Sequence, residues 1–286
     1  MYTVKNHTCE RNDDPVKPKF SVCIDMMYAD APFDQRTSLA KCDGADAVEF
    51  WKWSNKDINL LADNLHELSL DAALMNLDSA DEKLSFDMSR GVLSHRRTDD
   101  LVRAIHETAP VMRRLGMKNA IVLAGDKDDE ISEEEALENI EYTLRNGVKA
   151  AEDEGITLLL EPLNTFDRPS YVLPYSAPAL EIVSSVGSPN LKLLFDIYHT
   201  VRMESSETEY LTRTITENIR LIGHFHVANS PLRCEPPNGE IDYPAVFDAI
   251  AATDYDGYIG FEYRPSEKGR DFSLGKWLAK YKNERN

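Results

Sequence analysis

Cysteine is scarce in this 286-residue sequence, and its four copies show no spacing typical of a metal or redox site. Cys9, Cys23, Cys42 and Cys234 are scattered, without the CxxC pairs that mark zinc ribbons and redox dithiols. We therefore expect no structural zinc site made of thiolates and no disulfide scaffold. Free thiols are the rule in the reducing cytosol, so this pattern favours a cytoplasmic protein.

Long apolar runs are also lacking. No segment approaches the roughly 18 apolar residues that a membrane-spanning helix needs. The polar N-terminus, MYTVKNHTCERNDDPVKPKF, has no apolar core of the kind found in secretory signals. The sequence thus predicts no membrane partner, and an N-terminal tail over residues 1–19.

Basic residues are also few. The sequence has 32 Lys and Arg against 50 Asp and Glu, which gives a formal net charge of −18. Such a field repels phosphate backbones and anionic lipid surfaces, so we expect no nucleic-acid partner. The chain is nevertheless 42% hydrophobic, which is enough to build a sizeable core and is not typical of disordered proteins.

From Phe20 onward, short apolar runs alternate with stretches of helical periodicity, as in chains whose parallel strands are joined by crossover helices. The runs with the length of strands are 20–24, 47–51, 72–77, 120–125, 156–161, 191–196, 221–227 and 258–262. No glycine-rich phosphate loop follows the first run, which disfavours a dinucleotide-binding sheet. The sequence predicts an α/β protein in which residues 20–286 form a single (β/α)8 TIM barrel, with an open doubly wound sheet as the alternative.

The connection after the third run, residues 78–96, shows no clear periodicity. It is the longest irregular connection that we expect, and it is long enough to form a lid or a binding loop. Farther along, Ser132 and Glu135 have the spacing of a capping box and predict the start of a helix over 132–154.

Polar side chains stand at the ends of the last four strand-like runs. Glu161, Asp196 and Glu262 each end an apolar run, and His226 lies near the end of the seventh. In a β/α barrel the carboxyl ends of the strands meet at one rim, where active sites lie. Charges that emerge from buried strands must pair, bind a metal or change their pKa. Three carboxylates and one imidazole predict a site for one divalent ion, either magnesium, manganese, cobalt or zinc.

Four segments resemble the sugar isomerase/epimerase superfamily with the xylose-isomerase-like TIM barrel, and within it the hydroxypyruvate isomerase family. They are LLLEPLNTFDRPSYVL, KLLFDIYHTVRME, IGHFHVANSPLRCEPPNGEIDYPAV and YIGFEYRP. The resemblance runs from Phe20 to Glu262, and the motifs EPLN, FDIYH, GHFHVA and NGEIDYP are specific to the group. It implies the same barrel as the strand pattern does.

By this resemblance, Glu161, Asp196, His226 and Glu262 hold one divalent ion, and Glu161 and Glu262 are also the catalytic acid and base. The implied reaction interconverts hydroxypyruvate and 2-hydroxy-3-oxopropanoate by proton transfer through an enediolate. By analogy with relatives, we expect a homo-oligomer, either a dimer or a tetramer.

Several alternatives stay open, among them a related dehydratase or keto-acid decarboxylase and a non-catalytic sugar-binding protein. Sugar 3-epimerases of the superfamily have histidine at the position of His226, so the same constellation also suits a ketose 3-epimerase or another sugar or keto-acid isomerase. Apurinic-site endonucleases share the barrel but carry a three-zinc cluster that needs several histidines, and of the seven in this chain at most two lie near strand ends outside the four-ligand set.

Further residues near the predicted rim have two interpretations each. His199 and Arg233 match family positions that contact the substrate, and a guanidinium suits a carboxylate because it binds two oxygens at once. In the other interpretation, neither residue contacts the substrate: His199 is a core histidine and Arg233 is a solvated loop residue. His224 shares the strand face of His226 but lies deeper, which predicts a hydrogen bond inside the core. The second run ends with three large or charged side chains, Glu49, Trp51 and Trp53. They either line the pocket or pack against neighbouring residues.

Overall fold

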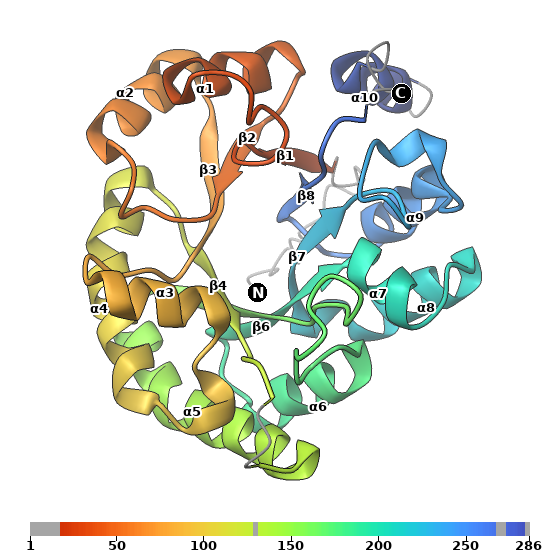
Figure 1. The fold of residues 1–286 in the computed structure, drawn as a ribbon. Helices are drawn as coiled ribbons and strands as arrows, with labels where there is room; N and C mark the ends of the chain where they lie inside the picture. Colours follow the sequence, from red (N-terminus) through yellow and green to blue (C-terminus); the bar gives the residue numbers. More distant parts are fainter. Residues whose placement is uncertain (1–17, 128–130, 267–272, 284–286) are drawn as a thin grey trace, which may run out of the picture.

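The computed structural model describes residues 18–127, 131–266 and 273–283. The strands are β1 (Lys19–Cys23), β2 (Ala47–Phe50), β3 (Asp71–Asn76), β4 (Asn119–Leu123), β5 (Thr157–Glu161), β6 (Leu191–Asp196), β7 (Ile222–Val227) and β8 (Tyr258–Phe261). They form one closed parallel barrel in chain order, which the pairing of β1 with β8 completes (Figure 1). The predicted TIM barrel is confirmed, and each strand overlaps its predicted run. The predicted tail falls almost wholly on residues 1–17, outside the described residues, and Lys19 is already part of β1.

Helices surround the barrel as an outer ring (Figure 1). The α-helices are α1 (Phe33–Cys42), α2 (Ile58–Leu68), α3 (Glu82–Arg90), α4 (Thr98–Leu115), α5 (Glu133–Glu154), α6 (Ser176–Val186), α7 (Ile197–Met203), α8 (Thr208–Asn218), α9 (Tyr243–Ala251) and α10 (Leu274–Asn283). Short 3₁₀ turns are η1 (Leu93–His95), η2 (Ile219–Leu221) and η3 (Pro236–Asn238).

Local signals in the sequence set several helix ends. The side chain of Ser132 accepts a hydrogen bond from the backbone N–H of Glu135 at 3.1 Å, so the predicted cap opens α5. Gly116 and Gly155 follow α4 and α5 in the left-handed conformation, with φ of 67° and 69°. Glycine adopts this conformation without the steric cost that a side chain brings, which explains why these helices end where they do.

The expectation of an irregular connection over residues 78–96 is wrong, because this segment contains α3 and η1. The side chain of Asp81 caps α3 by accepting a hydrogen bond from the backbone N–H of Leu84 at 2.9 Å. Only one narrow stripe of α3, including Leu84 and Met88, is buried. The helix has nine residues, most of them polar, so only a few apolar positions mark it in the sequence.

The register of the last strands brings their ends together. Asp196 on β6 pairs in register with His226 on β7. Glu161 on β5 pairs in the same way with Leu123 on β4. Val227 pairs with Phe261, so Glu262 follows directly after the last paired residue of β8. The polar residues predicted from strand ends are therefore held at one rim by the hydrogen-bond ladder of the barrel.

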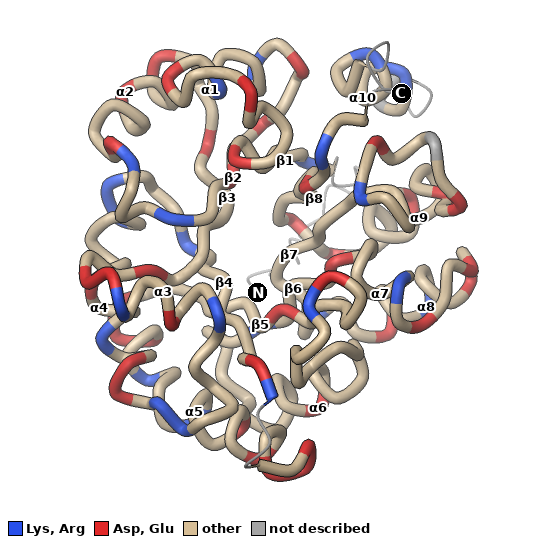
Figure 2. Tube along the Cα trace, viewed as in Figure 1, with Lys and Arg blue, Asp and Glu red and all other residues tan. Residues whose placement is uncertain are grey.

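Acidic residues are spread over the outer helices with basic residues between them (Figure 2). Among the described residues, no helix is long and apolar enough to cross a membrane. Cys23, Cys42 and Cys234 are free thiols, whereas Cys9 lies outside the described residues.

Candidate metal-binding active site

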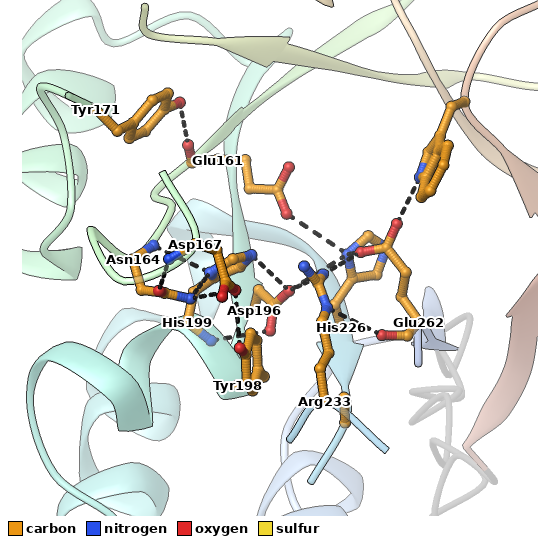
Figure 3. Close-up of polar contacts among 12 residues, drawn as sticks. Glu161, Asn164, Asp167, Tyr171, Asp196, Tyr198, His199, His226, Arg233 and Glu262 are labelled. Carbon is orange, nitrogen blue, oxygen red and sulfur yellow. Dashed lines mark hydrogen bonds and ion pairs between the residues drawn. The ribbon is translucent and has the colours of Figure 1, made fainter. Parts of the chain in front are cut away.

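The four predicted ligands meet at the carboxyl ends of β5 to β8 (Figure 3). One ligand atom from each of Glu161, Asp196, His226 and Glu262 lies within 4.8 Å of the others, and all four residues are buried. The Nδ1 atom of His226 lies 3.2 Å from Glu262 Oε2, 3.6 Å from Glu161 Oε1 and 3.9 Å from Asp196 Oδ2. The imidazole thus faces three carboxylates that arrive from three other strands.

This arrangement fits a divalent cation. Nδ1 of His226 is buried and has no hydrogen-bond partner among the described residues, although it points at the carboxylates. A buried polar atom without a partner is costly, and a bound ion would satisfy it together with the three negative charges around it. Three carboxylates and one imidazole nitrogen suit magnesium, manganese, cobalt or zinc.

The two glutamates of the site, Glu161 and Glu262, have pKa values shifted in opposite directions. Burial raises the pKa of Glu161, and the neighbouring charges of Glu262 and Asp196 add to this effect. Burial also acts to raise the pKa of Glu262, but the charges of His226 and Arg233 outweigh it and hold that pKa well below its ordinary value. Burial acts to lower the pKa of His226, but the carboxylates of Glu262, Glu49 and Glu161 outweigh it and hold that pKa above its ordinary value. Two carboxylates in one site therefore differ in proton affinity.

Arg233 lies in the loop after β7 and contacts two of the four ligand residues. Its Nη2 atom donates to Asp196 Oδ2 at 3.0 Å and to Glu262 Oε2, and its Nε donates to the backbone carbonyl of Glu262 at 3.3 Å. Its guanidinium also lies 5.0 Å from the centre of the Tyr198 ring. The residue belongs to the site and is not a solvated loop arginine.

His199 is held in one orientation by the loop after β5. Its Nδ1 atom accepts a hydrogen bond from the backbone N–H of Asn164 at 3.0 Å, which leaves the proton on Nε2. Nε2 lies 3.6 Å from Asp196 Oδ2 and has no hydrogen-bond partner among the described residues. Burial lowers the pKa of His199 to about 4, so the ring is a neutral donor that faces the site.

A second polar cluster lies inside the barrel next to the candidate ligands. The carboxylate of Glu49 contacts His224 Nε2 at 2.7 Å through Oε1 and His226 Nε2 at 3.0 Å through Oε2, and Ser21 also donates to it. The charges of His224 and His226 outweigh burial and lower the pKa of Glu49 to about 2. His224 makes the predicted core hydrogen bond. The role of Glu49 is not evident from the sequence, because its histidine partners lie on β7, far away in the chain.

Gly260 makes room for this cluster. A Cβ atom at its position would lie 2.4 Å from Glu49 Oε1 and 2.8 Å from His224 Nε2. Such distances are far below van der Waals contact, so the absence of a side chain on β8 is what allows Glu49 to reach across the barrel.

The two tryptophans after β2 have different positions. Trp51 Nε1 donates to Glu262 Oε1 at 2.7 Å, so this indole forms part of the site. Trp53 Nε1 donates instead to Thr108 Oγ1 on α4 at 3.1 Å, and its role is packing.

Comparison with known proteins agrees with this geometry. The family model described as "Xylose isomerase-like TIM barrel" matches residues 38–281. The hydroxypyruvate isomerase of Escherichia coli K12 is 33% identical over 86% of this chain and 93% of its own length. The 2-oxo-tetronate isomerase of Cupriavidus necator is 34% identical over 92% of this chain and 98% of its own.

Solved structures show the same barrel. A protein from Brucella melitensis described as "AP endonuclease, family 2" has a TM-score of 0.81 and 27% identity, and the match covers 92% of this chain and 99% of that one. A 3-keto-D-glucoside 4-epimerase from E. coli has a TM-score of 0.71 at 20% identity, with 94% and 99% covered, and shows the fold alone. The closed barrel, the cluster at the ends of β5 to β8 and the family match agree: the chain belongs to the xylose isomerase-like TIM barrel family.

Proposed function

We propose that this protein is a divalent-metal-dependent isomerase that interconverts hydroxypyruvate and 2-hydroxy-3-oxopropanoate. The observation that carries the proposal is the convergence of Glu161, Asp196, His226 and Glu262 on one point at the barrel rim. The names of the relatives, hydroxypyruvate isomerase and 2-oxo-tetronate isomerase, support a short hydroxy-keto acid as the substrate.

The four residues would hold one divalent ion. When bound, the ion supplies positive charge that stabilises the negative charge developing on the substrate oxygens. Trp51 and Arg233 keep the Glu262 carboxylate in place through hydrogen bonds to its two oxygens. The guanidinium does the same for Asp196, so these side chains are oriented before a ligand arrives.

Glu161 and Glu262 are the proposed acid and base. Their environments push their pKa values apart, so that one is protonated at a pH where the other is charged, which is the pattern of acid and base pairs. The charged carboxylate takes a proton from the carbon that bears the hydroxyl next to the carbonyl. The hydroxyl proton passes to the former carbonyl oxygen, and the other group delivers a proton to the former carbonyl carbon, which gives the isomer. Delivery from the opposite face to the carbon that lost its proton would instead epimerise the substrate.

His199 and Arg233 are the proposed substrate-contacting residues. The Nε2–H group of His199 has no partner among the described residues and can donate to a substrate oxygen. Arg233 lies beside the same carboxylates, and its planar guanidinium can bind the substrate oxygens at the reacting end.

The endonuclease alternative receives less support from the site. Among the described residues, two groups of side chains could hold a metal ion, and both include His226. One group contains the four candidate ligands, and the other contains Glu49 and His224. They therefore offer one ion site with a carboxylate behind it, not a cluster of three ions. The formal net charge of −18 also opposes binding to DNA.

Proton NMR in deuterium oxide tests the proposed function. The protein is treated with EDTA, reloaded with magnesium or manganese, and incubated with hydroxypyruvate and with neutral ketoses. We expect conversion of hydroxypyruvate that depends on the ion, with deuterium entering the product. Exchange on a neutral ketose alone would show a ketose epimerase, and the absence of exchange on every compound would contradict the acid and base roles.

A further inference from the structure

A pocket of about 310 Å³ lies beside the candidate metal site, at the carboxyl ends of β1, β2 and β3. Its lining includes Asp25, Trp51, Lys52, Lys56, Asn76 and Ser89. None of these belongs to the predicted ligand set. Its volume is at the lower end of the range for small-molecule sites, which suits a ligand of a few carbons.

The pocket adjoins the reacting end of the site. Trp51 and Asn76 line it, and they also line a smaller space next to His226 and Glu262. Trp51 is in addition bonded to the Glu262 carboxylate at 2.7 Å. Trp51 and Asn76 therefore form a wall between the pocket and the Glu262 carboxylate, and the pocket lies directly beside the proposed reacting end.

Positive charge exceeds negative charge around the pocket. Asp25 is paired twice, with Lys56 at 2.9 Å and with Arg36 at 3.4 Å. Lys52 has no carboxylate within ion-pair distance in the part of the chain that the structure describes. Its ammonium donates only to Ser85, at 3.1 Å to the hydroxyl and 3.3 Å to the carbonyl oxygen.

Asp78, which is buried just after the end of β3, accepts a hydrogen bond from the backbone N–H of Ser54 at 2.9 Å and does not line the pocket. Among the residues that line the pocket, two cations, Lys52 and Lys56, face one carboxylate, Asp25, and a surplus of one positive charge remains. In a chain with a formal net charge of −18, a local surplus of this kind favours a ligand with one negative charge.

Asn76 adds an unused hydrogen-bonding group to the shared wall. Its Oδ1 atom is buried and has no partner in the described part of the structure. Buried amide oxygens are normally bonded, so this atom is available to a hydroxyl of a ligand. Arg233, by contrast, already faces the carboxylates of Asp196 and Glu262.

We infer that this pocket binds the carboxylate end of a short hydroxy-keto acid, with Lys52 as the specificity-determining cation and Asn76 as a partner for a substrate hydroxyl. The inference rests on the proposed function, because it concerns the substrate of the same site. Lys52 selects acids over neutral sugars, and the chemistry at Glu161 and Glu262 is separate from this selection.

The test compares Lys52→Met with the wild type and with Lys52→Arg, which keeps the charge. With magnesium present, calorimetry measures binding of D-glycerate, a hydroxy acid that has no carbonyl group to isomerise. Because a charge-assisted hydrogen bond is lost, we expect Lys52→Met to weaken binding roughly tenfold or more and Lys52→Arg to restore most of it. Lys83→Met, which removes an exposed lysine on α3, is the matched control and should leave binding unchanged.

Turnover gives a second measurement. The Michaelis constant of Lys52→Met should rise for hydroxypyruvate, while that for dihydroxyacetone, its neutral counterpart, should change little. Equal effects on both compounds, or D-glycerate binding that does not respond to Lys52→Met, would overturn the assignment of Lys52. If the wild type binds D-glycerate through Lys52 but does not convert hydroxypyruvate, the proposed reaction fails and the carboxylate subsite stands.

Discussion

Glu49 holds the imidazole of His226 from the side opposite the candidate metal site. Its Oε2 atom contacts His226 Nε2 at 3.0 Å, while Nδ1 of the same ring faces Glu161, Asp196 and Glu262. A carboxylate behind a ligating histidine fixes the proton on the far nitrogen and leaves the near nitrogen free to bind a metal. Glu49 is therefore a positioning residue for the candidate ligand His226.

Glu49→Gln should weaken metal binding, because an amide holds the imidazole less strongly and does not balance its charge. Loss of such a partner typically reduces metal affinity by roughly 10- to 100-fold. Calorimetric titration of the EDTA-treated protein with manganese measures this directly. Glu204→Gln, a change at a glutamate bonded to Ser176 and Tyr210, is the control. Equal affinities for the wild type and Glu49→Gln would contradict the positioning role.

Gly260→Ala should destabilise the fold, because the added methyl group would overlap with the Glu49 carboxylate and the ring of His224. Overpacking of this kind costs about 1–3 kcal/mol. Urea denaturation measures the free energy of unfolding, and the same variant should also bind manganese less tightly. A variant as stable as the wild type would show that the cluster can move aside.

Glu161→Gln and Glu262→Gln should each remove most turnover, because each removes a group that must take or give a proton. General acid and base groups contribute typically about 10²- to 10⁴-fold to the rate. Deuterium incorporation from solvent, followed by NMR, reports on the proton transfer itself. If either variant keeps near-normal exchange, that residue is not an acid or base of the reaction.

His199 should make stability depend on pH. Burial lowers its pKa to about 4 in the folded protein, below its value in the unfolded chain, so the unfolded state binds more protons between these values. Its contribution is present above about pH 6.5 and is lost as the pH falls toward 4. We expect the drop in unfolding free energy from pH 7 to pH 5 to be smaller in His199→Gln by about 2 kcal/mol. Parallel pH profiles of the two proteins would argue against a buried neutral ring.

The barrel was predictable because its strands are buried on both faces and read as continuous apolar runs. For the same reason, the ends of those runs located Glu161, Asp196 and Glu262 at one rim. The helix α3 was missed because it is short and mostly polar, with three buried residues among nine.

Residues on β2 and in the loop after it were harder to interpret than those on β5 to β8. Glu49 lies within an apolar run, and its partner His224 is 175 residues away in the chain. Lys52 has the sequence context of an ordinary surface lysine. That no carboxylate pairs with it among the described residues depends on how the chain folds around it. Periodicity and strand-end counting carry no information on contacts of this kind.

The closed barrel divides the candidate site between two halves of the chain. The ends of strands β5 to β8 carry the proposed acid, the proposed base and the remaining candidate ligands, whereas the pocket with Lys52 lies at the ends of β1 to β3. In evolutionary terms, the first half can accumulate substitutions that change the accepted substrate while the second half keeps its chemistry. Direct bonds from Trp51 to Glu262 and from Glu49 to His226 join the halves, and these are positions where drift in one half would disturb the other.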